Sequence, residues 1–97
     1  MGKRVLLVED ELNIIEAIRF LLPREGWQVD THSHGSTALD AIREAQPDLV
    51  VLDYMLPGRS GMDILTDLRA DPDFEKLPVL MLTARGQARD REQAGKA

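Results

Sequence analysis

Three acidic residues stand directly after two short apolar segments of the chain. Glu9 and Asp10 follow residues 5–8, and Asp53 follows residues 49–52. Short, continuously apolar segments between helical patterns are typical of parallel strands that are covered on both faces. Ligands of such sheets bind beyond the carboxyl ends of the strands. If the two strands are neighbours, the three carboxylates converge, and they repel one another unless a cation lies between them or one takes up a proton.

The donor types around this point favour magnesium and phosphorus chemistry. Carboxylate oxygens without histidine or cysteine are the ligands that Mg²⁺ prefers. An aspartate beside such a metal can act as a nucleophile toward phosphorus, which makes Asp53 the candidate nucleophile. Thr83 follows the last apolar segment and could reach the same place with its hydroxyl group, while Ala84 would leave room for a phosphoryl group.

Strand and helix signals alternate along the chain and must position these residues. Helical periodicity over residues 12–22, with Ile14, Ala17, Ile18, Leu21 and Leu22 on the inner face, predicts the first helix. Ser36 is expected to cap a second helix, and Ser60 is expected to cap a third. The remaining expected elements are strands over residues 3–8, 27–32, 48–52 and 78–82, a loop over 54–60, and a weak fourth helix over 87–97.

This order predicts an α/β fold with a parallel sheet and helices on both faces, because crossover connections between parallel strands are right-handed. Two common strand orders fit the pattern. The flavodoxin-like order makes the first and third strands neighbours and places the ligand crevice between them, where the carboxylates are expected. Their placement therefore favours a flavodoxin-like sheet of order 2-1-3-4.

Composition narrows the possible functions. The 97 residues suit a single domain, residues 1–97, and the net charge of −5 argues against a general nucleic-acid surface. The chain contains no cysteine, which excludes disulfides and thiol catalysis. No apolar stretch approaches the length of a membrane span, so we expect a soluble cytoplasmic protein.

Taken together, these motifs resemble the receiver domain of two-component response regulators. The resemblance rests on Glu9-Asp10, on Asp53 within Leu-Asp-Tyr-Met-Leu-Pro-Gly-x-x-Gly, and on Leu-Thr-Ala at residues 82–84. It runs from Lys3 to about Ala94. The sequence of residues 81–86 is most similar to that of receivers that precede winged-helix DNA-binding domains. This similarity implies a role in transcription regulation.

The resemblance implies a role for each acidic residue. Asp53 matches the phosphoryl acceptor and a metal ligand, and Glu9 and Asp10 match the acidic pair that binds Mg²⁺, with Asp10 favoured as the direct ligand. The backbone carbonyl of Met55, two residues after the acceptor, matches a further metal ligand.

The resemblance also implies the remaining parts of the signalling reaction. Thr83 matches the switch hydroxyl that turns toward the phosphoryl group, and Ala84 matches the small residue beside it. The phosphoryl donor would be a phosphohistidine of a sensor histidine kinase. The domain would not be an enzyme with a separate substrate, because it would promote its own phosphorylation and dephosphorylation.

Receivers continue into a fifth strand ending in Lys-Pro and into a fifth helix, which these 97 residues do not include. We therefore expect a truncated receiver in which the apolar strand over residues 78–82 forms a sheet edge. Such an edge is a template for pairing with another chain, so a homo-oligomer is expected, paired or exchanged through this strand and the last helix.

Three other interpretations compete with a phosphate-accepting domain. Asp10 could simply cap the first helix. The chain could be a non-switching dimerisation or docking module. It could also be an aspartate-nucleophile phosphohydrolase, but that class resembles Asp-x-Asp, and here Met55 occupies the second position.

Overall fold

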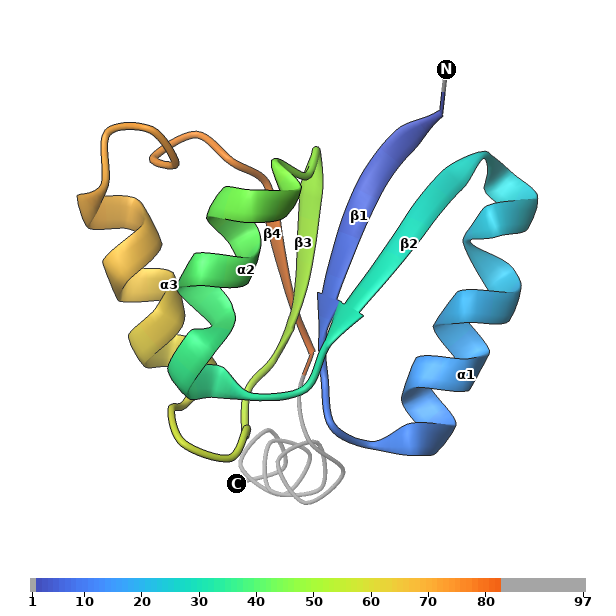
Figure 1. Ribbon diagram of the computed structural model, residues 1–97, viewed down its shortest axis with the longest axis horizontal. Helices are drawn as coiled ribbons and strands as arrows, with labels where there is room; N and C mark the ends of the chain where they lie inside the picture. The colour runs from blue at the N-terminus through green and yellow to red at the C-terminus, as the bar shows by residue number, and fades with distance from the viewer. Residues whose placement is uncertain (1, 83–97) are drawn as a thin grey trace, which may run out of the picture.

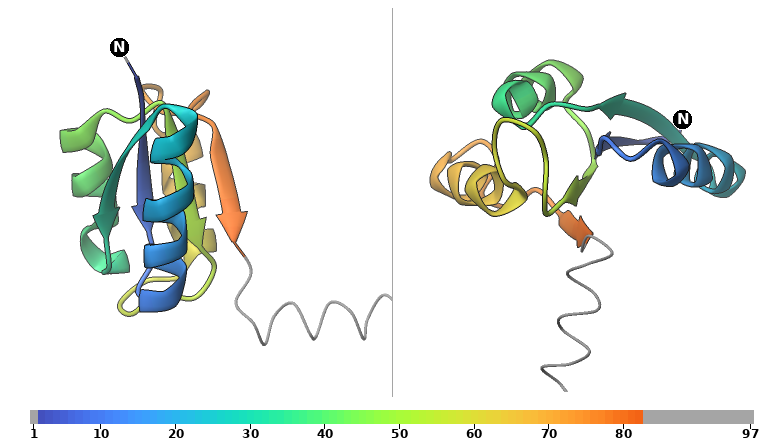
Figure 2. Two further views of the ribbon diagram at one scale, coloured as in Figure 1. Left: turned by 90° about the vertical axis from the view of Figure 1, so that its right-hand side faces the viewer. Right: turned by 90° about the horizontal axis from the view of Figure 1, so that it is seen from below.

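The computed structural model describes residues 2–82, which form a four-stranded parallel sheet covered by helices on both faces (Figure 1). Helix α1 lies on one face, and α2 and α3 lie side by side on the other (Figure 2). The element bounds are β1 Lys3–Val8, α1 Leu12–Leu21, β2 Trp27–His32, α2 Ala38–Ala45, β3 Leu49–Asp53, α3 Gly61–Ala70 and β4 Val79–Leu82, with short 3₁₀ helices at Pro23–Glu25 and Gly35–Thr37.

The strand order is β2-β1-β3-β4, so the predicted flavodoxin-like order is confirmed. In this order β1 lies between β2 and β3, and Val8 pairs with His32 on one side and with Leu52 on the other. The ends of β1 and β3 therefore lie next to each other, at the bottom of the molecule in Figure 1.

Two separate groups of core side chains cover the two faces of the sheet. Alternate residues of β1 and β3 point to opposite faces, because side chains alternate along a strand. Leu6, Val8, Val50 and Leu52 pack with buried residues of α2 and α3, including Ile42 and Ile64. Val5, Leu7 and Val51 pack on the face of α1.

Helix α1 is less deeply buried than the sequence pattern predicts. None of its residues is fully buried, and Ile15 and Ile18 are the α1 side chains that pack on the core group of Val5, Leu7 and Val51. The expectation that Leu21 lies on the inner face is wrong, because this side chain is 56% exposed. The inner face is rotated toward Ile15, and it does not include Ala17.

The two predicted serine caps have different outcomes. Ser60 is the N-cap of α3, and its hydroxyl accepts a hydrogen bond from the N–H of Asp63 at 3.2 Å, as predicted. The prediction that Ser36 caps the second helix is wrong. A 3₁₀ turn over Gly35–Thr37 comes first, and α2 begins only at Ala38.

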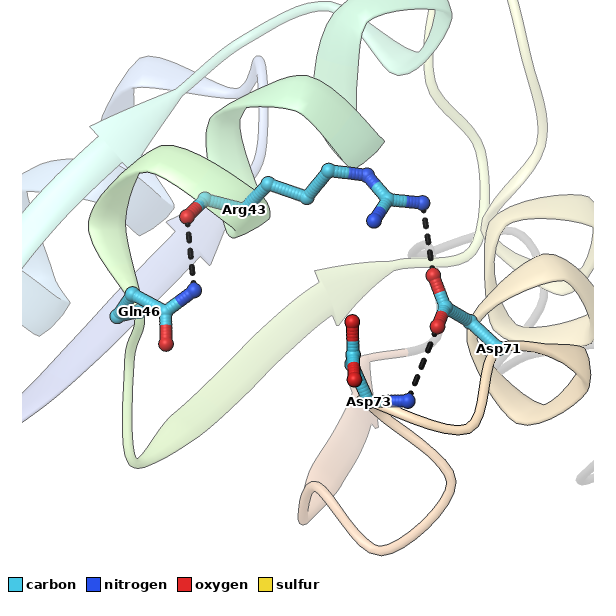
Figure 3. Close-up of polar contacts among 4 residues, drawn as sticks. All are labelled: Arg43, Gln46, Asp71 and Asp73. Atoms are coloured by element: carbon cyan, nitrogen blue, oxygen red, sulfur yellow. Dashed lines mark hydrogen bonds and ion pairs between the residues drawn. The ribbon is translucent and has the colours of Figure 1, made fainter.

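Polar contacts link α2 to the segment between α3 and β4 (Figure 3). Arg43 of α2 forms an ion pair with Asp71 at 2.7 Å, and its guanidinium also lies 5.5 Å from the ring centre of Phe74. Asp71 in turn accepts a hydrogen bond from the N–H of Asp73 at 3.0 Å. These two donors hold the pKa of Asp71 below its usual value, with the Asp73 N–H contributing most.

Strand β4 is only partly covered within residues 2–82. It pairs with β3 in that part of the chain, and Leu80 is 54% exposed, although the apolar sequence predicts cover on both faces. The helix predicted over residues 87–97 lies outside the described residues. Within residues 2–82, no helix is long and apolar enough to cross a membrane.

Candidate metal and phosphate site

Three carboxylates from two neighbouring strands meet at the carboxyl edge of the sheet. Glu9 and Asp10 follow β1 directly, and Asp53 is the last residue of β3. One carboxylate oxygen from each lies within 4.8 Å of the others. The structure therefore brings together the three acidic residues predicted from the sequence, which we call the acidic cluster (Glu9, Asp10 and Asp53).

The members of the acidic cluster differ strongly in burial. Glu9 is 1% exposed and Asp53 is 6% exposed, whereas Asp10 is exposed to solvent. Oε2 of Glu9 accepts hydrogen bonds from the N–H groups of Asp10 at 3.1 Å and Glu11 at 2.9 Å. Oε1 of Glu9 is buried and has no hydrogen-bond partner within residues 2–82. A buried acceptor without a partner is costly, so a missing donor or cation fits this position.

The electrostatics of the acidic cluster point the same way. The pKa of Glu9 is raised to about 7, chiefly by burial; the neighbouring Asp53 carboxylate contributes to the rise, and the two backbone N–H donors oppose it. Burial also raises the pKa of Asp53, with the charge of Asp10 adding to it. Neither of the two ion pairs found within residues 2–82 involves the cluster. Its negative charge is thus uncompensated in that part of the chain.

Asp10 is not the residue that caps α1. The N-cap is Glu11, whose side chain accepts from the N–H of Asn13. The alternative in which Asp10 serves only as a helix cap is therefore wrong. Its carboxylate is exposed to solvent and has an oxygen within 4.8 Å of carboxylate oxygens of Glu9 and Asp53.

The loop between β3 and α3, residues 54–60, begins at the acidic cluster. The N–H of Met55 donates to Oδ1 of Asp53 at 3.3 Å, and the Met55 side chain is 60% exposed. The loop closes on itself where the N–H of Gly61 donates to the carbonyl of Tyr54 at 2.8 Å. A Cβ at Gly61 would fall on the carbonyl oxygen of Asp53, so only glycine allows α3 to start this close to the end of β3.

Thr83 and Ala84 lie outside the described residues, and their predicted roles stay predictions. The residue before them, Leu82, pairs with Asp53 across β3 and β4. The N–H of Tyr54 also donates to the carbonyl of Leu82 at 2.9 Å. The described part of β4 thus ends beside the acidic cluster.

The cluster fits a hard divalent cation of the Mg²⁺ type. All of its donors are oxygens, one of them is a buried acceptor without a partner, and the mutual repulsion would be relieved by a positive charge.

Gly35 was not predicted to support the site. Its N–H donates to the carbonyl of Pro57 at 2.9 Å and so joins the β3–α3 loop to the Gly35–Thr37 turn. A lone glycine between two polar segments gives no periodic signal, and only the packing of the two loops identifies it.

Comparisons with known proteins agree with this geometry. Residues 5–97 match the model of the response regulator receiver domain family. The chain is 43% identical over 91 residues to the phosphate regulon transcriptional regulatory protein PhoB of Rhizobium meliloti, covering 94% of this chain and 40% of that protein. The chain thus spans about two-fifths of the length of this relative.

Solved structures show the same fold. A response regulator from Chloroflexus aurantiacus superposes with a TM-score of 0.84 at 29% identity, covering 99% of this chain and 79% of that one. The receiver domain of the sensor histidine kinase PA1611 from Pseudomonas aeruginosa superposes with a TM-score of 0.82 at 28% identity. The match covers 95% of this chain and 75% of that one. That structure holds a magnesium ion coordinated in its active-site cleft. The chain described here belongs to the response regulator receiver domain family.

Proposed function

We propose that this domain accepts a phosphoryl group on Asp53 from a phosphohistidine of a sensor histidine kinase, with Mg²⁺ as cofactor. One observation carries the proposal: three carboxylates lie within 4.8 Å of one another, and an oxygen of the most buried one has no hydrogen-bond partner in the described part of the chain. By analogy with PhoB, the phosphorylated domain would serve transcription regulation in the cytoplasm.

Asp53 acts as the nucleophile in this proposal. One of its carboxylate oxygens bonds to phosphorus, the phosphorus–nitrogen bond of the phosphohistidine breaks, and the imidazole keeps the electron pair. The Met55 N–H, 3.3 Å from Oδ1, limits rotation of the carboxylate. The burial of Asp53 also keeps bulk water away from the reacting oxygen.

Glu9 and Asp10 hold the cation in this proposal. Two backbone N–H groups fix Oε2 of Glu9, which leaves Oε1 as its donor atom, and Asp10 adds an exposed carboxylate. When bound, Mg²⁺ neutralises charge in the acidic cluster and on the phosphoryl oxygens. The Met55 carbonyl is the proposed backbone ligand, Thr83 is the proposed switch hydroxyl, and Ala84 leaves space for the phosphoryl group.

The domain is proposed not to be an enzyme with a separate substrate. It promotes its own phosphorylation and the later hydrolysis of the aspartyl phosphate. In the second step a water oxygen bonds to phosphorus and loses a proton to solvent, the bond from phosphorus to the Asp53 oxygen breaks, and inorganic phosphate leaves while the carboxylate keeps the electron pair.

Intact-protein mass spectrometry tests the proposal. The chain is incubated with acetyl phosphate, with and without Mg²⁺, and one phosphoryl adduct is expected only with the metal. Asp53→Asn should abolish the adduct, whereas Asp40→Asn, which changes an exposed aspartate of α2, should leave it intact. An adduct of equal yield in Asp53→Asn would contradict the proposal.

We also propose that the chain self-associates along β4. Within residues 2–82 this strand pairs with β3 alone and Leu80 is 54% exposed, so in that part of the chain an apolar side chain lies on a strand edge without a second partner. Light scattering over a range of concentrations should show a dimer or larger assembly. Leu80→Lys should shift it to monomer, and Leu12→Lys, at a residue of α1 that is 65% exposed, should not. A monomeric wild-type chain would contradict this proposal.

A further inference from the structure

The Gly35–Thr37 turn and the β3–α3 loop are in direct backbone contact. Gly35 is buried, and its N–H donates to the carbonyl of Pro57 at 2.9 Å. A Cβ at Gly35 would fall on the carbonyl oxygen of Arg59 and within 2.9 Å of the Arg59 Cβ. Any side chain at this position would push the two segments apart.

A second glycine allows the same contact from the side of the loop. Gly58 has a φ of +88°, and a Cβ there would lie 3.1 Å from the Cβ of Ser36 and 3.2 Å from its N and Oγ atoms. These separations are tighter than ordinary van der Waals contact, so the loop would have to move away from the turn. The two glycines thus set the distance between the turn and the loop.

The turn is itself fixed to the strand that borders the acidic cluster. Nε2 of His32, the last residue of β2, lies 2.7 Å from Oγ1 of Thr37. The carbonyl of His32 accepts a hydrogen bond from the N–H of Glu9 at 2.9 Å. One series of hydrogen bonds therefore runs from Glu9 through His32 and the turn to Pro57 in the loop.

We propose that Gly35 and Gly58 are positioning residues for the metal site. Gly35 lies against Arg59 of the loop, and Gly58 lies against Ser36 of the turn. Through these two contacts the turn holds the β3–α3 loop, and with it the Met55 carbonyl, in the position at which that carbonyl binds the cation. This inference rests on the proposed function, which makes the Met55 carbonyl a ligand. Mg²⁺ demands near-ideal octahedral geometry, so displacement of one ligand by a few tenths of an ångström weakens its binding.

The chain offers a matched pair of variants to test this role. Gly58→Ala and Gly26→Ala both place a side chain at an exposed residue with positive φ, +88° and +94° respectively. Both therefore carry the same kind of backbone strain. A Cβ at Gly26 meets nothing within 4 Å, and Gly26 lies at the other end of the sheet, just before β2 begins. The backbone strain should cost both variants similar stability, and only Gly58→Ala should also disturb the loop.

Two readouts follow the loop without measuring phosphorylation. Mg²⁺ affinity is measured by titration of amide NMR shifts, and protection of the Gly35 N–H is measured by hydrogen exchange. Gly58→Ala should weaken Mg²⁺ binding about tenfold, the usual cost of removing support behind a metal ligand, and should speed exchange at Gly35. Gly26→Ala should match the wild type in both. The double variant Ser36→Gly/Gly58→Ala removes two of the three Ser36 atoms that the new Cβ meets, Cβ and Oγ, and keeps the backbone N, so it should recover part of the lost affinity.

The outcomes separate the positioning role from the proposed function. A wild-type chain that binds no Mg²⁺ would overturn both. A wild-type chain that binds Mg²⁺ while Gly58→Ala and Gly26→Ala bind it equally would overturn the positioning role alone. A loss of affinity that persists in full in the double variant would also overturn it, since the contact with the Ser36 side chain would then not be its cause.

Discussion

The burial of Glu9 leads to a prediction that is opposite to the usual effect of changing a buried residue. Glu9→Gln should stabilise the metal-free domain at pH 8 and change its stability little at pH 5. Glutamine has the same shape, and its amide oxygen can still accept from the N–H groups of Asp10 and Glu11. Its NH₂ group would occupy the place of the buried Oε1, which has no hydrogen-bond partner among the described residues. The neutral amide cannot repel the Asp53 carboxylate.

The magnitude follows from the pKa of Glu9, which rises from 4.5 to about 7 because of burial. A carboxyl group with a raised folded-state pKa binds its proton more tightly when folded. Its contribution to stability is therefore fully present below pH 4.5 and is lost as pH rises through 7. At about 1.4 kcal/mol per pKa unit, the wild type loses roughly 3 kcal/mol by pH 8 but less than about 1 kcal/mol by pH 5. The variant escapes this loss.

Urea denaturation at the two pH values, in EDTA, measures the effect. With a denaturant slope of about 1–3 kcal/mol per molar urea, the midpoint of Glu9→Gln should exceed that of the wild type by at least about 1 M at pH 8. Glu16→Gln, an exposed change in α1, should show no difference. Mg²⁺ at pH 8 should stabilise the wild type more than Glu9→Gln, because it binds the folded chain through the carboxylate. A Glu9→Gln chain that is less stable than the wild type by the same amount at both pH values would refute the reasoning.

Three further predictions concern the scaffold around the site. Ile42→Ala removes most of a fully buried side chain from the core on the α2 side, and it should lower the free energy of unfolding by about 2–5 kcal/mol in urea denaturation. The control Leu12→Ala, at an exposed residue, should lower it by less than about 0.5 kcal/mol. A loss below about 1 kcal/mol for Ile42→Ala would contradict the packing. Arg43→Gln should lower the urea midpoint at pH 6, and the difference should narrow toward pH 3, because Asp71 has a lowered pKa and its contribution is lost as pH falls; a constant difference would count against the ion pair. Gly61→Ala should lower both thermal stability and Mg²⁺ affinity in spite of the better helix propensity of alanine, and a rise in melting temperature would show that the carbonyl of Asp53 can move away.

Much of the fold was predictable because short segments of the sequence carry the signals for its helices and strands. Apolar segments of strand length, helical periodicity and proline or glycine breaks gave the bounds of β1 and β2 without error, and those of β3 and β4 to within one residue. The placement of Glu9, Asp10 and Asp53 directly after two strands favoured the order 2-1-3-4, in which those strands are neighbours. The structure has this order, and the three carboxylates meet. Local signals and the chemistry of the site here point to the same topology.

The features that were not predicted depend on contacts between distant segments. The sequence alone could not indicate that Gly35 lies against Arg59, because neither residue belongs to a periodic pattern. Ser36 had the right residue type for a helix cap, but a 3₁₀ turn moved the start of α2 to Ala38. The inner face of α1 was misplaced because Leu21 fits helical spacing as well as Ile15 does, and only packing on the sheet decides between them.

Chemical identification of the phosphorylated residue would decide whether Asp53 is the phosphoryl acceptor. The chain is phosphorylated with acetyl phosphate and Mg²⁺ and then reduced with borohydride, which converts an aspartyl phosphate into homoserine, and the peptides are sequenced by mass spectrometry. We expect homoserine at position 53, and unmodified residues at positions 9 and 10. Modification at Asp10 or Glu9 with Asp53 unchanged, or no modification anywhere in a folded chain saturated with Mg²⁺, would contradict the account.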